Sequence, residues 1–330
     1  MRYGRVLVGV MKLLVTGGAG FIGSALTAQL VHEGHDVVVI DNFNEYYDVR
    51  LKRDRVAALI PTVPVYFLDI TNKAALHALC KTYQFDAVCH LAGQAGVRYS
   101  IEAPASYIEA NVLGTQTIFE VMRLVGIPRM VFASTSSAYG TSTVAPFKED
   151  ATADRPVSVY AATKRAAELI AHTYYNQYQI ETTCLRFFTV YGPWSRPDMA
   201  MLKFAEAIMN NEPIDVYNDG KLRRDFTFVA DIVAGFVAAL NRPLGYEIVN
   251  IGNGKPVELL MFITLLEESL GKSAIKRFLP MQPGDVFETY ADTTKAERLL
   301  GFRAQTDFAT GIERFAAWFL DYRRTKSGDR

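Results

Sequence analysis

Seven short apolar runs, rich in β-branched and aromatic residues, alternate with helical patterns along this chain. The runs are 12–16, 36–40, 64–68, 86–91, 129–134, 182–187 and 247–251. Strands buried on both faces are continuously apolar, and a helix between successive strands allows them to pair in parallel. The alternation therefore predicts an α/β fold built on a doubly wound parallel sheet.

Helical patterns fill most of the intervals between these runs. They cover 22–33, 72–83, 105–125, 158–178, 199–210, 229–240, 258–270 and 307–323. A chain of 330 residues exceeds the usual size of one compact core, so a second unit is expected. We expect a first domain over 1–188 with return segments near 226–251. Residues 189–330 are expected to form mainly a smaller, interleaved α/β lobe that binds substrate.

Composition narrows the partners that the chain can have. Lys and Arg together number 35, as do Asp and Glu, so the formal net charge is zero. This balance argues against nucleic acid and anionic membranes as partners, and no apolar stretch is long enough to span a bilayer. The three cysteines (Cys80, Cys89, Cys184) lack metal-ligand spacing, so we expect no metal and a cytoplasmic location. Residues 1–10 are interpreted as an extension before the first strand, with Met11 as an alternative start.

A glycine-rich turn directly follows the first predicted strand. The segment GGAGFIG places Gly17, Gly20 and Gly23 between that strand and a helix. Such glycines allow a tight turn and a close approach of the backbone to a pyrophosphate at the helix N-terminus. Asp41 ends the second strand, where a carboxylate accepts hydrogen bonds from ribose hydroxyls and repels a 2′-phosphate. The combination favours a Rossmann domain that binds NAD rather than NADP.

Further residues are expected along the same cofactor. Asp69 is a candidate contact for the adenine amino group, and a cap at the strand end is an equally good interpretation. Gly93 and Gln94 follow the fourth strand, where a small residue would let the cofactor approach the backbone. The predicted cofactor site comprises Gly17, Gly20, Phe21, Ile22, Gly23, Asp41, Asn42, Asp69, Ile70, Leu91, Ala92, Gly93, Gln94, Tyr160 and Lys164.

Tyr160 and Lys164 are four residues apart in a predicted helix, so their side chains share one face. Thr135 ends the fifth predicted strand. A tyrosine phenol has a reference pKa of about 10, and a nearby ammonium is expected to lower that pKa. Tyr160 would then accept a proton from a sugar hydroxyl, with Thr135 aligning the oxygen and Lys164 holding the ribose. An ordinary helical Tyr/Lys pair is the alternative.

The Tyr-x-x-x-Lys pair, the upstream hydroxyl and the glycine turn resemble the extended short-chain dehydrogenase/reductase superfamily over nearly the whole chain. The resemblance implies NAD as cofactor, a nucleotide sugar as substrate, and a homodimer formed through the Tyr160 helix and the preceding long helix. It also implies that Arg224 binds the UDP diphosphate and that Asp285 contacts the nucleotide ribose. Arg223 is either a second diphosphate ligand or a solvated neighbour.

The segment LRFFTVYGPWSRPDMA (185–200) is expected to leave a strand, cross a loop and enter a helix. A hydroxyl and a guanidinium in one loop suit a carboxylate. Together with HLAGQAGVRYS and DNFNEYYD, the segment resembles the UDP-glucuronate 4-epimerases. That resemblance implies that Arg196, Thr189 and Ser136 bind the uronate carboxylate. The remaining candidate substrate contacts are Arg98 and Ser137.

The residues after Thr135 indicate which reaction is expected. Dehydratases and decarboxylases of this superfamily carry acidic residues there, whereas this chain has Ser136 and Ser137. Epimerisation by return of the same hydride needs no such acid, so 4-epimerisation of UDP-glucuronate through a 4-keto intermediate is predicted. A UDP-glucuronate decarboxylase, a 4-epimerase of neutral UDP-hexoses or UDP-N-acetylhexosamines, and a non-catalytic NAD-binding protein are the alternatives.

Two residues depart from the pattern of the resembled family. Ser195 stands where glycine is usual, and Gly93 stands where alanine is usual. We expect the first to affect the direction of Arg196. The second is expected to enlarge the space near the cofactor.

Overall fold

The computed structural model describes residues 9–141, 143–281 and 286–327. Its main sheet has seven parallel strands, and each of the seven predicted apolar runs forms one of them. In sheet order the strands are β10 (Tyr246–Ile251), β6 (Glu181–Phe187), β5 (Arg129–Thr135), β4 (Ala87–His90), β1 (Lys12–Thr16), β2 (Asp36–Asp41) and β3 (Val65–Phe67). The predicted doubly wound sheet is confirmed.

Both faces of this sheet are buried under helices, as the continuous apolar runs require. Leu13 and Val15 belong to one hydrophobic cluster with residues of α1 (Phe21–His32) and α9 (Val229–Leu240). Leu14 belongs to a second cluster on the other face, because successive side chains of a strand point to opposite faces. The helices that contribute to that second cluster are α3 (Lys73–Tyr83), α6 (Thr115–Val125) and α7 (Val159–Tyr178).

The strand order reverses direction between β1 and β4, which are neighbours in the sheet but not in the chain. In sheets of this kind a crevice opens beyond the carboxyl ends of the strands at the reversal. The glycine turn follows β1, and residues 91–94 follow β4. The fold therefore brings both predicted cofactor segments to one crevice.

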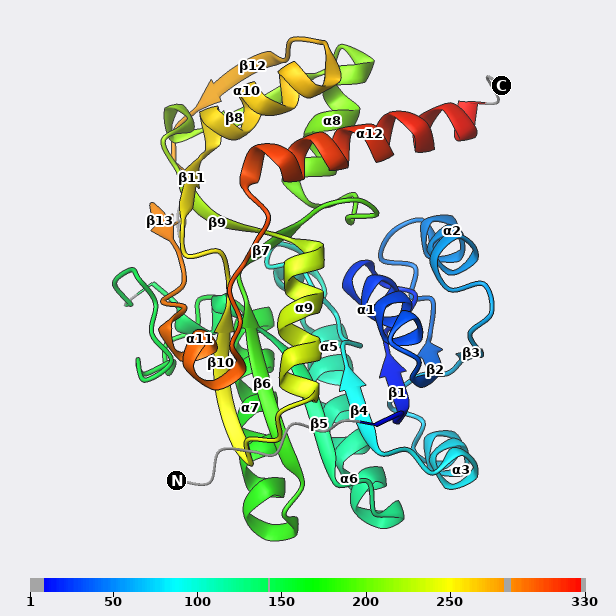
Figure 1. Cartoon of the computed structure of the whole chain (residues 1–330). Helices are drawn as coiled ribbons and strands as arrows, with labels where there is room; N and C mark the ends of the chain where they lie inside the picture. Colours follow the sequence, from blue (N-terminus) through cyan, green and yellow to red (C-terminus); the bar gives the residue numbers. More distant parts are fainter. Residues whose placement is uncertain (1–8, 142, 282–285, 328–330) are drawn as a thin grey trace.

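A smaller lobe lies beyond the edge at which these strands end (Figure 1). Two small sheets are described in it, one centred on β9 (Arg223–Phe228) and one pairing β8 (Pro213–Tyr217) with β12 (Ile275–Leu279). The strands that join β9 are β7 (Thr189–Tyr191), β11 (Pro256–Glu258) and β13 (Glu288–Thr289). The helices of the lobe are α8 (Ala200–Asn210), α10 (Leu259–Leu270) and α12 (Phe308–Ser327).

The chain returns from the lobe to the main sheet through α9 and β10. Helix α9 packs on α1, and β10 pairs with β6 at the sheet edge. Strand β9 covers 223–228 and pairs with lobe strands, so α9 and β10 form the return within the segment expected near 226–251. Arg223 and Arg224 are accordingly the first two residues of a lobe strand.

Three local predictions differ from the structure. The helix expected over 105–125 is three segments: α5 (Pro104–Tyr107), a π-helical η1 (Ile108–Gly114) and α6. The 185–200 loop contains the short strand β7, which begins at Thr189. Helix α2 (Val49–Leu59) was not predicted, because two of the three side chains that it buries are Lys52 and Arg55.

The remaining short elements complete the described fold. They are α4 (Tyr99–Glu102), η2 (Ser136–Tyr139), η3 (Asn218–Gly220) and α11 (Thr294–Leu300). Within the described ranges, none of the helices combines the length and apolarity needed to cross a membrane.

Candidate active site

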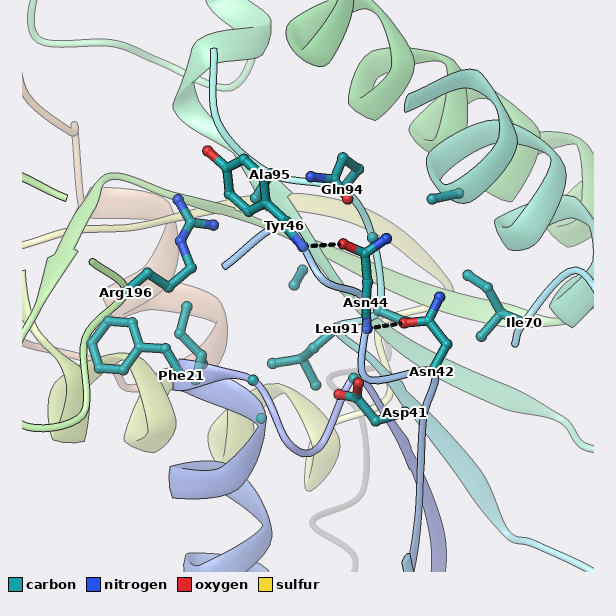
Figure 2. A pocket seen from close by; sticks show the side chains of 18 of the residues that line it. Phe21, Asp41, Asn42, Asn44, Tyr46, Ile70, Leu91, Gln94, Ala95 and Arg196 are labelled. Carbon is teal, nitrogen blue, oxygen red and sulfur yellow. Dashed lines mark hydrogen bonds between the residues drawn. The ribbon is translucent and has the colours of Figure 1, made fainter. Parts of the chain in front are cut away.

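A cavity of about 480 Å³ opens at the carboxyl edge of the main sheet. It is lined by the segments that follow β1, β2, β4 and β6, by Thr135 at the end of β5, and by the first turns of α7. Figure 2 shows Asn42 and Ile70 toward one side of the cavity and Arg196 toward the opposite side. Every residue of the predicted cofactor site lines this cavity.

The three motif glycines of the turn have no room for a side chain. Gly17 has a φ of 72°, and a Cβ there would lie 2.7 Å from the backbone nitrogen of Ala92. A Cβ on Gly23 would lie 2.2 Å from the carbonyl oxygen of Gly17. This packing holds the turn closely against the N-terminus of α1, where backbone N–H groups and the helix dipole favour an anion. The observed cradle fits the pyrophosphate of a dinucleotide.

Asp41 is buried at the end of β2, next to the glycine turn. Its carboxylate accepts hydrogen bonds from the backbone N–H groups of Ala19 (3.1 Å) and Phe43 (2.8 Å). Lys52 places its Nζ 3.6 Å from the same carboxylate. Burial lowers the pKa of Lys52, and the charge of Asp41 opposes that change. The repulsion that Asp41 would exert on a 2′-phosphate is therefore partly balanced by a cation that the sequence did not reveal.

Asp69 caps the turn at the end of β3, and its contact with adenine stays a prediction. Its carboxylate accepts hydrogen bonds from Asn42 Nδ2 (2.7 Å) and from the backbone and hydroxyl of Thr71 (2.8 and 2.7 Å). These bonds cap the turn after β3 while the residue also lines the cavity beside Ile70. Burial alone would raise the pKa of Asp69, but the hydrogen bonds from Thr71 and Asn42 lower it overall.

Asn111, on the π-helical segment η1, is hydrogen-bonded to the loop after β4. It is buried, accepts a hydrogen bond from the backbone of Gln94 (2.8 Å) and donates to the Gln94 carbonyl (3.0 Å). It also donates to Thr163 (3.0 Å), whose hydroxyl donates to the Tyr160 carbonyl (2.8 Å). A Cβ at Gly93 would lie 2.6 Å from Asn111 Oδ1. Glycine at position 93 therefore allows the close approach of Asn111, rather than simply enlarging the cofactor space.

Thr135, Tyr160 and Lys164 line the same cavity. Thr135 ends β5, and its hydroxyl accepts a hydrogen bond from the backbone of Ser137 (3.1 Å). Tyr160 and Lys164 lie in the first two turns of α7. The Lys164 ammonium lies 4.2 Å from the centre of the Phe132 ring.

The pKa of Tyr160 differs from the expectation. Burial raises it, whereas the hydrogen bond with Thr135 and the positive charge of Arg196 lower it by smaller amounts. Desolvation of the phenolate outweighs the neighbouring charges, so the prediction of a lowered pKa was wrong for the protein alone.

Lys164 is itself perturbed by its buried position. Burial lowers its pKa to about 8, and the charge of Glu168 opposes this shift. Glu168 is fully buried and accepts hydrogen bonds from Arg186 Nε (2.9 Å), Arg186 Nη2 (2.7 Å) and Ser134 (2.6 Å). It also pairs with Arg165 at 3.0 Å. A network of charges centred on buried Glu168 and Arg186 therefore continues from the Tyr160–Lys164 face of α7, and Arg186 Nη1 has no hydrogen-bond partner among the described residues.

Thr189 and Arg196 also line the cavity, in the segment predicted to recognise a carboxylate. Arg196 pairs with Asp198 through Nε–Oδ1 and Nη2–Oδ2 contacts, both 3.0 Å. The hydroxyl of Tyr46 donates to Asp198 at 3.2 Å. The N–H groups of Nε and Nη2 on one side of the guanidinium thus donate to Asp198. The remaining N–H groups of Nη1 and Nη2, at the end of the guanidinium, can donate to a second carboxylate.

Four other candidate substrate contacts are not among the residues that line this cavity. Arg98 stacks over the Tyr217 ring at 5.9 Å, and Arg224 donates to the carbonyl groups of Arg223 and Phe287. Ser136 and Ser137 begin η2, directly after Thr135. Asp285 lies outside the described residues. The roles of all five in binding substrate stay predictions.

Several residues that line the cavity were not predicted from the sequence. They are Asn44, Tyr46, Tyr47, Lys52, Thr71, Ser106 and Glu109. Tyr46 had a usable signal, because the alternating Asp and Asn of DNFN favour successive side-chain-to-backbone turns. Asn42 accepts from the Asn44 N–H (3.1 Å) and Asn44 from the Tyr46 N–H (2.8 Å), as Figure 2 shows. No sequence signal pointed to Lys52 or Glu109 as residues of the cavity lining.

Known proteins resemble this chain over nearly its whole length. A UDP-glucuronate 4-epimerase of Thermodesulfobacterium geofontis is 43% identical over 308 residues, covering 92% of this chain and 95% of the relative. A solved UDP-glucuronic acid 4-epimerase from Bacillus cereus, in complex with UDP-glucuronic acid and NAD, is 35% identical. That comparison has a TM-score of 0.88 and covers 94% of this chain and 100% of the other.

A UDP-glucose 4-epimerase from Thermotoga maritima, solved with UDP-glucose, superposes equally well. It has a TM-score of 0.88 at 29% identity and covers 95% of this chain and 100% of the other. Residues 13–252 match the epimerase family described as the NAD dependent epimerase/dehydratase family. The chain therefore belongs to the NAD dependent epimerase/dehydratase family.

Proposed function

We propose that this protein is an NAD-dependent UDP-glucuronate 4-epimerase. It would interconvert UDP-glucuronate and UDP-galacturonate through a 4-keto sugar, without decarboxylation. The observation that carries this proposal is the shared cavity: Thr189 and Arg196 line it together with Thr135, Tyr160 and Lys164. Residues suited to bind a carboxylate thus line the same cavity as residues suited to oxidise an alcohol.

The cofactor would lie along the glycine turn and Asp41, with its reactive end toward Tyr160 and Lys164. When bound, NAD supplies an acceptor for the hydride of the sugar C4 and a donor for its return. Tyr160 takes the proton of the C4 hydroxyl and later gives it back, and Thr135 aligns that hydroxyl by hydrogen bonding. Lys164 holds a positive charge at the site below a pH of about 8.

The uronate substrate imposes a further requirement. Its 4-keto form is a β-keto acid, which loses carbon dioxide when the carboxylate stands perpendicular to the ketone. Arg196 and Thr189 would hold the carboxylate away from that geometry while the sugar turns, which is a case of preorganised binding. The serines after Thr135 supply no acid for competing chemistry.

Product identification tests the function. The purified protein is incubated with UDP-glucuronate, without added NAD, and the products are followed by NMR. UDP-galacturonate is the expected product, because the cofactor starts and ends oxidised and stays bound. UDP-xylose would instead indicate a decarboxylase. Turnover of UDP-glucose with none of UDP-glucuronate would indicate a neutral-sugar epimerase.

A homodimer is proposed for the assembly. Exposed apolar side chains Ile108, Leu113 and Leu169 lie on η1 and α7, which pack against each other. Apolar surface of this kind is favourable to bury between copies. Light scattering should give the dimer mass for the purified chain and a monomer for Leu169→Arg, and a monomeric parent chain would refute the proposal. The cytoplasmic location stays a prediction.

A further inference from the structure

Arg55 is a fully buried arginine, with an exposed fraction of 0%, on the outer helix α2. Within the described ranges it forms no ion pair, and its guanidinium donates only to neutral oxygens. These are the carbonyls of Trp194 (3.0 and 2.7 Å), Ser195 (3.4 Å) and Ala19 (3.4 Å), and the hydroxyl of Tyr47 (2.6 Å). Burying an arginine this way is costly, so the contacts that it makes call for an explanation.

Two of the acceptors, Trp194 and Ser195, immediately precede Arg196, and the Trp194 carbonyl accepts the two shorter bonds. Trp194 has a φ of 66°, a left-handed conformation that a bulky residue rarely adopts. Its ring packs 5.2 Å from Trp318 and 5.1 Å from Tyr322, measured between ring centres. Contacts from elsewhere must therefore impose the conformation of this turn, and Arg55 fixes the two carbonyls at its centre.

The segment after Arg196 also contacts the part of the chain that leads into α2. Asp198 orients the guanidinium of Arg196 and accepts a hydrogen bond from Tyr46. Tyr46 lies in the segment between β2 and α2, and Figure 2 shows it with Arg196 among the side chains around the cavity. Residues 46–55 thus hold the turn before Arg196 and the carboxylate after it.

We propose that Arg55 is a positioning residue for substrate selectivity. By holding the Trp194 and Ser195 carbonyls, it directs Arg196 at the substrate carboxylate, so that residues 46–55 favour a uronate over a neutral hexose. This inference rests on the proposed function. It assigns to α2 a role in sugar recognition, although Arg55 itself is not among the residues that line the cavity.

A purely structural arginine and a positioning arginine make different predictions. Loss of a structural arginine would weaken UDP-glucuronate and UDP-glucose equally, because both share the UDP group and the sugar ring. Loss of a positioning arginine would weaken the uronate selectively, since only the uronate presents a carboxylate to Arg196. The ratio of the two dissociation constants is therefore the informative measurement, and it needs no turnover.

Calorimetric titration of the NAD-containing protein with UDP-glucuronate and with UDP-glucose provides the test. Arg55→Met is expected to weaken UDP-glucuronate by about tenfold or more, as for a misdirected charged hydrogen bond. UDP-glucose should change by less than about twofold. Arg55→Lys should lie between, because one ammonium cannot reach all four acceptors. Arg53→Met, an exposed position on the same helix, is the matched control and should behave as the parent.

Equal weakening of both ligands, or no change in either, would overturn the inference. If Arg55→Met does not fold, Tyr46→Phe tests the other flank, where the same selective loss is expected and equal loss contradicts it. Measurements on the unsubstituted protein distinguish a failure of the proposed function from a failure of the role of Arg55. A parent that does not prefer UDP-glucuronate refutes the proposed function, whereas a preference that survives in the Arg55 variants refutes only the role of Arg55.

Discussion

Arg196 is the residue on which discrimination between a uronate and a neutral sugar should depend. Its guanidinium lies in the cavity with 23% of the side chain exposed and is oriented by Asp198. Hydrogen bonds to a charged group contribute about 1.5–3 kcal/mol each. A residue with this partner and this location is suited to hold a carboxylate during catalysis.

Arg196→Ala is accordingly expected to raise the KM for UDP-glucuronate by about 10–100-fold. It should also release a UDP-pentose by-product, because the carboxylate of the 4-keto sugar becomes free to reach the geometry for decarboxylation. Steady-state kinetics and NMR of the products measure both effects. An unchanged KM together with an unchanged product mixture would contradict the assigned role of Arg196.

Ser195 lies in the turn directly before Arg196 and has ordinary backbone geometry. The left-handed residue of the turn is Trp194, not Ser195, so the backbone does not require glycine at position 195. The serine hydroxyl is buried and finds no hydrogen-bond partner among the described residues. An unpaired buried hydroxyl costs about 1–3 kcal/mol.

Ser195→Ala should therefore leave stability unchanged or raise it by about 1 kcal/mol, without altering the KM for UDP-glucuronate. Urea unfolding followed by circular dichroism measures the change. Ser134→Ala is the matched control, because the Ser134 hydroxyl donates to buried Glu168 at 2.6 Å, and it should lose stability. A destabilised Ser195→Ala variant would mean that its hydroxyl is satisfied in solution.

At the scale of the elements, α7 carries Tyr160, Lys164 and Glu168 at intervals of four residues, so one helical face joins the site to the buried network beneath it. Because the pKa of Lys164 is lowered to about 8, its charge is present below that pH and lost above it. Glu168 opposes the lowering. Removing the negative charge of Glu168 should move the loss of the ammonium to lower pH.

Glu168→Gln is thus expected to shift the alkaline limb of the kcat/KM profile to lower pH. Profiles measured from pH 6 to 10, a range chosen to bracket the lysine titration, would show the shift. Glu120→Gln is the control, since Glu120 lies on α6 and pairs with Arg123. If the alkaline limb does not move in a folded Glu168→Gln variant, the titration of Lys164 does not cause that limb.

The elements also show how far sequence patterns reach. The strands of the main sheet were predictable because residues such as Leu13, Leu14 and Val15 are all buried and burial on both faces leaves a continuous apolar run. Helix α2 was hidden because its buried face carries Lys52 and Arg55, which a hydrophobic pattern counts as solvent-facing. The raised pKa of Tyr160 depends on burial by distant segments, which no local motif encodes.

At the scale of the molecule, the two predicted domains share one hydrophobic core. Leu13 and Leu26 of the first domain belong to the same buried cluster as Phe262 and Phe315 of the lobe. Helix α9 and strand β10, which follow the first lobe segments in the chain, complete the main sheet and cover its face. Residues 1–188 alone would leave that face and the edge of β6 exposed to water.

The whole chain should consequently unfold in a single cooperative transition, because neither unit can lose its packing without exposing the other. Differential scanning calorimetry of the cofactor-free protein measures this, with a calorimetric enthalpy equal to the van't Hoff enthalpy expected. A fragment of residues 1–188 should show no cooperative transition, since β6 lacks its partner β10 and α1 lacks α9. Two resolved transitions in the full chain, or a folded fragment, would mean that the domain boundary at 188 separates independent folding units.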